Sequence, residues 1–331
     1  MPQPIAPASS QPAPARDVTF CECFARDGLQ HEERFIDTAI KVELIDRFTR
    51  IGFTRIGFPR IEATSFSHPK HVPQFADAES LLAAITRRPG ARYKATCANM
   101  HSVNRALTAK RDGYGPEEIS FLISATESHT RKNLNRSREE QWRLIEQMAT
   151  VTAGKFVLVG AVSMIVGCIF EGEVDPAIVV EDVRRFHSLG VKVITLGDTA
   201  GLGTPRSVAR LVGELRSAVP DTTLVAHFHN SRGTAMTNCI AAWQAGVTHF
   251  DSSFGGIGGH PAQIQYGEGN TGNVPTEDLV VLFESMGVKT GLDLELMMDT
   301  ARFCERTLDR ELLGMVTRTS YAGAARHRLV A

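Results

Sequence analysis

The stretch "VKVITLGDTAGLGTPRSVARLVGELRSAVPDTTLVAHFH" (residues 191–229) decides the fold, because it contains one whole strand–helix–strand unit. Its ends, "VKVITLG" (191–197) and "TTLVAHFH" (222–229), are short runs rich in β-branched residues, as buried strands are. Between them, "RSVARLVGELRSAV" (206–219) repeats apolar residues at three- and four-residue spacing, which indicates one face of a helix. Two strands joined in this way are expected to lie parallel in one sheet.

The same alternation runs along the rest of the chain. Six further strand-like runs are "VTFCE" (18–22), "RIEAT" (60–64), "RYKATC" (92–97), "EISFLIS" (118–124), "FVLVGAVSM" (156–164) and "THFDSSF" (248–254). Helical patterns lie between them, for example over 37–52, 138–153 and 175–190. Eight strands that alternate with helices, with no linker-like composition between them, predict an α/β fold of one domain, a (β/α)8 TIM barrel, rather than two domains.

Further segments extend this barrel. "TEDLVVLFESMG" (276–287) and "DLELMMDTARFCERTLD" (293–309) predict a closing helix and a short C-terminal helical extension. We expect the catalytic barrel over 17–288, the appended helix over 289–313 and a polar, basic tail over 314–331. The Pro/Ala-rich start (1–16) predicts a disordered tail, and it lacks the basic start and apolar run of a secretory signal.

Composition narrows the range of partners. The chain has 331 residues, of which 43% are hydrophobic and 22% charged, and its formal net charge is −1. Such a balance gives no field that would attract nucleic acid or an anionic membrane, so we expect a small-molecule partner. No apolar run reaches the roughly 20 residues of a membrane-spanning helix, so the sequence predicts no transmembrane helix.

The six cysteines are too scattered for a compact disulfide framework or a paired zinc site. We interpret them as reduced thiols, which favours a cytoplasmic location. Cys21 and Cys23 share one face of the first predicted strand, and we expect them to be buried packing residues rather than metal ligands. Cys168 is likewise expected to be structural.

Polar residues gather where strands of a barrel end, and the carboxyl ends of the strands are where such barrels build their active sites. The chain supplies Arg26, Asp27 and Gln30 after strand one, Glu62 on strand two, Asp198 at the end of strand six, His227 and His229 at the end of strand seven, and His260, Asn270, Asn273 and Glu277 beyond strand eight. We therefore expect these side chains to converge on one site.

His227 and His229 lie two residues apart on a strand, so both imidazoles point to the same face, with α-carbons roughly 6–7 Å apart. Two imidazoles with a carboxylate and an amide oxygen suit an octahedral divalent cation, Mg²⁺ or Mn²⁺, that keeps open water positions. The pair predicts a metal site at the end of strand seven.

Six segments together resemble the 3-hydroxy-3-methylglutaryl-CoA lyases, which belong to the metal-dependent barrel superfamily of lyases and condensing enzymes. They are "RDGLQ" (26–30), "IEATSFSHPKHVPQ" (61–74), "GDTAGLGTP" (197–205), "AHFHNSRG" (226–233), "DSSFGGIGG" (251–259) and "TGNVPTEDL" (271–279). The resemblance spans roughly residues 18–310. It implies a barrel enzyme that cleaves a carbon–carbon bond of an acyl-CoA, and a homodimer.

The resemblance also implies roles for individual residues. The cation would be held by Asp27, His227, His229 and Asn273. Arg26 would lie over the thioester oxygen of the substrate and Asp198 near its hydroxyl, while Gln30, Glu62 and Glu277 would orient the ligands and Arg26. "SMIVGCIFEG" (163–172) would line the approach of the acyl-CoA.

These residue types match the chemistry of retro-Claisen cleavage. The reaction deprotonates a hydroxyl, releases an enolate and then protonates carbon. A divalent cation lowers the pKa of the hydroxyl, and a permanently charged arginine stabilises the enolate. Asp198 or the surroundings of a ligating histidine could accept the hydroxyl proton.

The acid that protonates carbon is the point at which this chain departs from the family. The lyases carry a cysteine in the pattern G-x-G-G-C-P, whereas this chain reads "GIGGHP" (256–261) with His260 in that place. Histidine titrates near neutrality and is a competent general acid or base. The following "AQIQYGEGNTGN" (262–273) also differs, which favours either a related but different 3-hydroxyacyl-CoA or a lyase in which histidine replaces the cysteine.

We predict a divalent-cation-dependent acyl-CoA lyase that converts 3-hydroxy-3-methylglutaryl-CoA, or a related 3-hydroxyacyl-CoA, to acetyl-CoA and a 3-oxoacid such as acetoacetate. Two alternatives stay open. One is an acetyl-CoA-dependent condensing synthase of the same superfamily, although such synthases usually carry a long C-terminal extension. The other is a barrel that binds metal and acyl-CoA without turnover.

Overall fold

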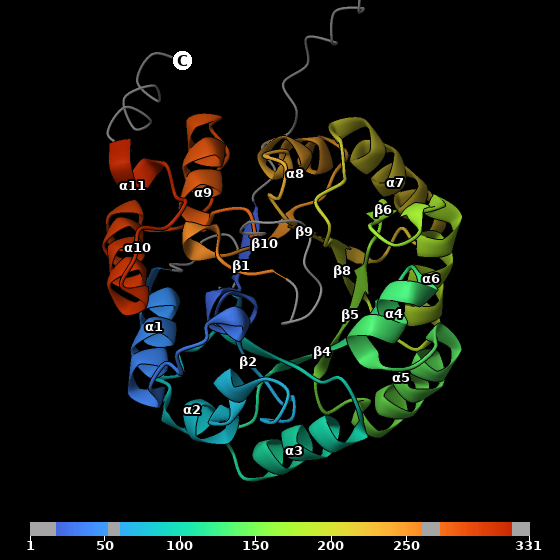
Figure 1. Cartoon of the computed structure of the whole chain (residues 1–331), viewed down its shortest axis with the longest axis horizontal. Coiled ribbons are helices and arrows are strands. Elements are labelled where there is room, and N and C mark those ends of the chain that lie inside the picture. Colours follow the sequence, from blue (N-terminus) through green and yellow to red (C-terminus); the bar gives the residue numbers. More distant parts are fainter. Residues whose placement is uncertain (1–17, 52–59, 260–271, 320–331) are drawn as a thin grey trace, which may run out of the picture.

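The structure is a computed structural model, and it describes residues 18–51, 60–259 and 272–319 (Figure 1). The predicted disordered tail (1–16) and His260 lie outside the described residues. Among the helices that are described, none is long and apolar enough to cross a membrane.

Eight parallel strands close into a barrel at the centre of the molecule, with each strand beside its neighbour in the order β1-β10-β9-β8-β5-β4-β3-β2 (Figure 1). The strands are β1 (Thr19–Glu22), β2 (Arg60–Ser65), β3 (Arg92–Thr96), β4 (Glu118–Ser124), β5 (Val157–Ser163), β8 (Val193–Asp198), β9 (Thr223–Phe228) and β10 (His249–Ser252). On β1, Cys21 pairs with Asp251 on one side and with Arg60 on the other, so β1 joins the last strand to the second. The predicted TIM barrel is confirmed.

Helices form a ring around the strands (Figure 1). They are α1 (Thr38–Ile51), α2 (Ala78–Ala84), α3 (Met100–Arg111), α4 (Glu127–Leu134), α5 (Arg138–Thr152), α6 (Pro176–Ser188), α7 (Pro205–Ala218), α8 (Ala235–Gln244), α9 (Thr276–Ser285), α10 (Leu294–Leu308) and α11 (Val316–Thr319). α7 illustrates why they form, since Thr204 and Ser207 make a reciprocal capping box and Pro205 stands at the first helical position. Its apolar stripe, which includes Leu211 and Leu215, is buried.

Several short elements were not predicted from the sequence, among them a helical turn and a hairpin. The chain makes the helical turn η1 (Phe24–Gly28) directly after β1. After β5 it makes an antiparallel hairpin of β6 (Gly167–Cys168) and β7 (Gly172–Glu173), within the segment that was expected to line the substrate approach.

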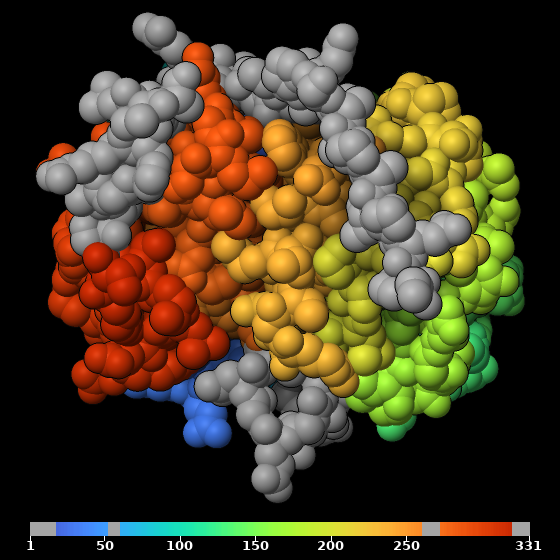
Figure 2. All heavy atoms as spheres, turned by 90° about the horizontal axis from the view of Figure 1, so that it is seen from above, coloured from blue at the N-terminus to red at the C-terminus, as the bar shows by residue number. Residues whose placement is uncertain are grey.

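The predicted C-terminal helical extension is present, with α10 and α11 packed against α9 on the outer surface (Figure 2). The segment between α10 and α11 also contacts the glycine-rich loop that follows β10. The Leu313 amide donates to the Gly255 carbonyl at 3.0 Å, and Leu312 packs where a side chain on Gly255 would lie. The extension thus supports a loop at the mouth of the barrel, while the predicted domain boundaries remain predictions.

Candidate active site

The turn η1 carries Arg26 and Asp27 from the end of β1 towards the barrel axis. Its start is fixed by Glu22, whose Oε1 accepts the Phe24 amide at 2.9 Å and the Phe254 amide at 3.1 Å. Glu22 Oε2 accepts the Thr276 hydroxyl at 2.6 Å. One buried carboxyl therefore ties the end of β1 to the glycine-rich loop and to the start of α9.

Asp27, His227 and His229 converge at the carboxyl ends of β1 and β9. Their ligand atoms all lie within 4.8 Å of one another. The two Nε2 atoms are 3.3 Å apart, and each lies 3.9 Å from Asp27 Oδ2. Burial opposes the ionisation of Asp27, but the charges of Arg26 and the two histidines outweigh it and hold the pKa of Asp27 well below its usual range.

Asn273 joins this cluster from the far end of the sequence. The segment around it bridges to the end of β9, with His229 opposite Asn273 and the Val274 amide donating to the Phe228 carbonyl at 3.2 Å. This pairing aims the amide inward, where Asn273 Nδ2 donates to Asp27 Oδ2 at 2.6 Å and to the Ile257 carbonyl at 3.1 Å. Asn273 is thus a fourth candidate ligand beside Asp27, His227 and His229.

The cluster fits a divalent cation. Asn273 is 1% exposed, and its Oδ1 is buried without a hydrogen-bond partner among the described residues. A buried carbonyl oxygen without a donor is costly, and a cation would satisfy it. Two imidazoles, a carboxylate and an amide oxygen form a donor set that suits Mg²⁺ or Mn²⁺.

Arg26 lies beside the cluster and is held from two sides. Its Nη1 donates to Asp27 Oδ1 at 2.8 Å, and its Nη2 lies 2.9 Å from Glu62 Oε2. Gln30 Nε2 donates both to Asp27 Oδ1 at 2.9 Å and to the Gly259 carbonyl at 2.8 Å. Gln30 and Glu62 therefore make the contacts that an orienting role requires.

A second carboxylate, Asp251 on β10, was not singled out from the sequence. Its Oδ2 lies 3.4 Å from His227 Nδ1, on the side of the imidazole away from Asp27. Burial alone would lower the pKa of His227, but the contact with Asp251 and the charge of Asp27 raise it above its ordinary value. A carboxylate on the second nitrogen is the usual way of fixing a ligating imidazole.

Lys94 on β3 was also missed. It is 2% exposed, and its Nζ lies 3.6 Å from Asp251 Oδ2 and 3.7 Å from Glu62 Oε1. The signal was available in "RYKATC" (92–97), where a lysine interrupts a run that is otherwise expected to be buried.

Asp198 does not join these residues. It is fully buried and faces away from the cavity, and its two oxygens accept the Leu202 amide at 3.0 Å and the Gly203 amide at 2.8 Å. The carboxyl fixes the turn that leads into α7, and the position beside the substrate hydroxyl stays a prediction. Its neighbours Gly197 and Thr199 line the cavity instead, because side chains alternate along the strand.

Glu277 binds the glycine-rich loop. Both of its carboxylate oxygens accept the Gly255 amide at 3.0 Å, and Gly314 packs directly against them. Burial raises the pKa of Glu277 to about 7. Glu277 thus holds the glycine-rich loop rather than a ligand or Arg26.

A cavity of about 790 Å³ opens over the cluster. Six of the predicted residues line it: Arg26, Asp27, Gln30, Glu62, His227 and His229. The volume lies within the range of small-molecule sites, and its position at the carboxyl ends of the strands is that of a barrel active site.

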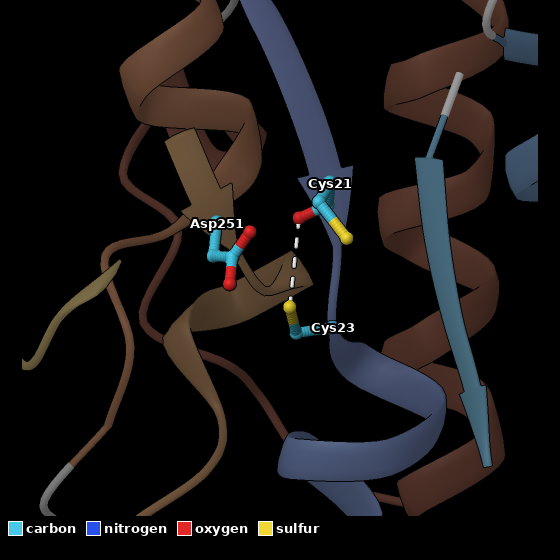
Figure 3. Close-up of side chains that lie close together, drawn as sticks. All are labelled: Cys21, Cys23 and Asp251. Carbon is cyan, nitrogen blue, oxygen red and sulfur yellow. Dashed lines mark hydrogen bonds between the residues drawn. The ribbon is translucent and has the colours of Figure 1, made fainter. Parts of the chain in front are cut away.

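The thiols of Cys21 and Cys23 lie near Asp251, as Figure 3 shows. The Cys23 thiol donates to the Cys21 carbonyl at 3.6 Å. The neighbouring side chain of Cys21 and burial raise the pKa of the Cys23 thiol well above its usual value, which disfavours the thiolate that a metal needs. The interpretation as packing residues is consistent with this arrangement.

Comparison with known proteins identifies the family to which this barrel belongs. The HMGL-like family model matches residues 17–304. The chain belongs to the HMGL-like family. A hydroxymethylglutaryl-CoA lyase, mitochondrial, of Macaca fascicularis is 35% identical to it, over 94% of this chain and 92% of that protein. A 3-hydroxy-3-methylglutaryl-CoA lyase, cytoplasmic, of Danio rerio is 36% identical, over 92% of this chain and 87% of that protein.

Solved structures agree with this membership. An HMG-CoA lyase from Acinetobacter baumannii, in complex with coenzyme A and 3-methylmalate, matches with a TM-score of 0.85 at 31% identity, over 94% of this chain and 97% of that one. The carboxyl transferase domain of Rhizobium etli pyruvate carboxylase has a TM-score of 0.64 at 18% identity, which relates the fold alone. The predicted HMGL-like membership is confirmed.

Proposed function

We propose that this HMGL-like chain is a divalent-cation-dependent carbon–carbon lyase that cleaves 3-hydroxy-3-methylglutaryl-CoA, or a related 3-hydroxyacyl-CoA, to acetyl-CoA and a 3-oxoacid. The observation that carries the proposal is the convergence of Asp27, His227 and His229 with Asn273 under a cavity of about 790 Å³, where Asn273 Oδ1 has no hydrogen-bond partner among the described residues. The relatives named as HMG-CoA lyases, one of them in complex with coenzyme A, support the same substrate class.

Asp27, His227, His229 and Asn273 would hold the cation, as Mg²⁺ or Mn²⁺. When bound, such a cation acts as a Lewis acid towards an oxygen of the substrate and favours loss of the hydroxyl proton. Asp251 keeps the imidazole of His227 oriented, and Gln30 keeps the carboxylate of Asp27 oriented, so the ligands need little rearrangement.

Arg26 would stabilise the enolate that leaves when the carbon–carbon bond breaks. Its guanidinium is fixed between Asp27 and Glu62 at the cavity wall, and its side chain is 19% exposed. A charge held in place before the reaction stabilises developing negative charge without reorganisation, and this is usually a large part of catalysis. Because Asp198 is turned away from the cavity, other groups on the cavity wall would accept the proton of the substrate hydroxyl.

His260 would protonate the carbon of the enolate. It lies outside the described residues, and the support comes from Gly259, the residue before it. The Gly259 carbonyl accepts from Gln30, which is also bonded to Asp27, so the chain reaches position 260 from a point anchored to a candidate ligand. Histidine in this position, where the lyases carry cysteine, also favours a substrate related to but different from 3-hydroxy-3-methylglutaryl-CoA.

The test is an assay of acetyl-CoA release. Protein freed of metal by a chelator is given Mg²⁺ or Mn²⁺ and a panel of 3-hydroxy-3-carboxymethyl acyl-CoAs of increasing chain length. We expect release that requires the cation and that falls at least 100-fold in Asp27→Asn and in Arg26→Ala. No release from any member of the panel would refute the proposal, and thiol release from acetyl-CoA on addition of a 2-oxoacid would favour a synthase instead.

We also propose that the enzyme acts in the cytoplasm as a homodimer. The location is supported by the cytoplasmic relative from Danio rerio, although the mammalian relative is mitochondrial. The dimer rests on the family resemblance, and light scattering of the purified protein measures it directly.

A further inference from the structure

Lys94 is a buried cation that the proposed reaction leaves without a role. It projects from β3 into the barrel, is 2% exposed and stands at the floor of the candidate active site. Its Nζ lies 3.7 Å from Glu62 Oε1 and 3.6 Å from Asp251 Oδ2. Burying an ammonium is expensive unless carboxylates compensate it, so the lysine and its two partners form one unit.

The two carboxylates serve different halves of the site. Glu62 Oε2 lies 2.9 Å from Arg26 Nη2, while its Oε1 accepts the Thr96 hydroxyl at 2.8 Å. Asp251 Oδ2 lies 3.4 Å from His227 Nδ1, and Figure 3 shows this carboxylate beside Cys21 and Cys23. Lys94 thus lies between the residue that holds the arginine and the residue that holds a candidate ligand.

We propose that Lys94 is a positioning residue, which holds the carboxylates of Glu62 and Asp251 and through them orients both Arg26 and His227. The inference deepens the proposed function and rests on it. Within the part of the chain that the structure describes, Lys94 pairs with Glu62 and Asp251 and makes no ion pair with Asp27. Its effect on the candidate ligands and on Arg26 passes through the two carboxylates.

Lys94 has two effects on the affinity of the site for a cation, one unfavourable and one favourable, and their opposite signs make the inference testable. A positive charge near the site repels a cation, so simple electrostatics predicts that removing Lys94 strengthens metal binding. As a brace, however, Lys94 keeps two buried carboxylates of like charge together. Without it no cation lies between them to offset their mutual repulsion, both carboxylates are held less firmly, and the support of His227 weakens. We expect the second effect to dominate.

The experiment measures Mn²⁺ binding to the chelator-treated protein by electron paramagnetic resonance, without substrate. Lys94→Met keeps the length of the side chain and removes the charge, and we expect its dissociation constant for Mn²⁺ to rise 10- to 100-fold. The matched control is Lys41→Met. Lys41 is also 2% exposed and lies 3.0 Å from Asp77 Oδ1, but it does not line the cavity. Its loss should lower stability and leave Mn²⁺ affinity unchanged.

A double-mutant cycle with Asp251→Asn tests the route of the effect. If Lys94 acts on His227 through Asp251, then Lys94→Met combined with Asp251→Asn should bind Mn²⁺ no more weakly than the poorer single variant. Lys94→Arg keeps the charge and should restore most of the affinity. Fully additive losses would overturn the route through Asp251.

The outcomes separate this inference from the proposed function. Wild-type protein that fails to bind Mn²⁺ would overturn both. Wild-type protein that binds Mn²⁺, beside a Lys94→Met variant that binds it equally well or more tightly, would overturn only the positioning role. A loss of affinity of the same size in Lys41→Met would also overturn it, because the effect would then be one of general stability.

Discussion

Gly258 offers the most direct test of the candidate metal site, because a single methyl group there meets two of the proposed ligands. Its φ is +126°, and a β-carbon on it would stand 2.8 Å from Asp27 Oδ2 and closer still to Asn273 Nδ2. Non-bonded heavy atoms rest at about 3.5 Å, so Gly258→Ala would push Asp27 Oδ2 by about 0.7 Å. A displacement of this order at a reacting centre costs roughly 100-fold.

The matched control for this change is Gly287→Ala. Gly287 follows α9 with φ +77°, and nothing lies within 4 Å of its would-be β-carbon. Both variants pay the backbone cost of a side chain at positive φ, roughly 1–3 kcal/mol of stability. Only Gly258→Ala should also move the ligands. We expect it to weaken Mn²⁺ binding and slow acetyl-CoA release by about 100-fold, whereas Gly287→Ala should retain both.

Three measurements on each variant complete this test: the free energy of unfolding from urea denaturation, the Mn²⁺ dissociation constant and the turnover number. If Gly258→Ala folds and keeps wild-type Mn²⁺ affinity and turnover within threefold, then Asp27 and Asn273 do not hold the cation. Equal losses in the two glycine variants would show that backbone strain alone is responsible.

Two further predictions concern buried carboxyls. Burial raises the pKa of Glu22 from 4.5 to about 8, so its contribution to stability is fully present below about pH 4.5 and is lost as the pH rises through 8. In Glu22→Gln the free energy of unfolding should therefore fall less steeply between pH 5 and 8.5, with the slope reduced by at most about 1.4 kcal/mol per pH unit. Urea denaturation at several pH values measures this slope, and an unchanged dependence on pH would contradict the prediction. Asp198→Asn should lose about 1–3 kcal/mol of stability, because one amide of Leu202 or Gly203 loses its acceptor, yet keep turnover within tenfold. A 100-fold loss of turnover with intact Mn²⁺ binding would indicate that Asp198 acts on the substrate.

The strands could be predicted because each is a short β-branched run between turn residues, and the barrel follows from their alternation with amphipathic helices. The barrel in turn explains why Asp27, His227 and His229 meet, since the carboxyl ends of its strands face one another. Asn273 required the family resemblance, because its place depends on a backbone bridge to His229 that no local pattern encodes.

The place of Asp198 beside the substrate rests on the family resemblance and stays a prediction, because periodicity tells which residues share a face but not which face looks into the barrel. Thr195, Gly197 and Thr199 line the cavity, so the residue between the last two must point outward. Lys94 and Asp251 were missed for a related reason. A charged residue inside a strand-like run is predicted to be exposed, because its partner on another strand of the barrel cannot be seen in the sequence. Lys94 and Asp251 are partners of this kind.

The pairing of β1 with β10 has a consequence for how this protein acquires activity. Asp27 follows the first strand and Asn273 follows the last, and the two side chains meet only where these strands close the ring. During synthesis on the ribosome no partial chain can hold all four candidate ligands until the segment beyond residue 273 has emerged and docked. Uptake of a cation by these four residues would therefore be a late event, and it would signal that the last of the eight strands has paired with the first.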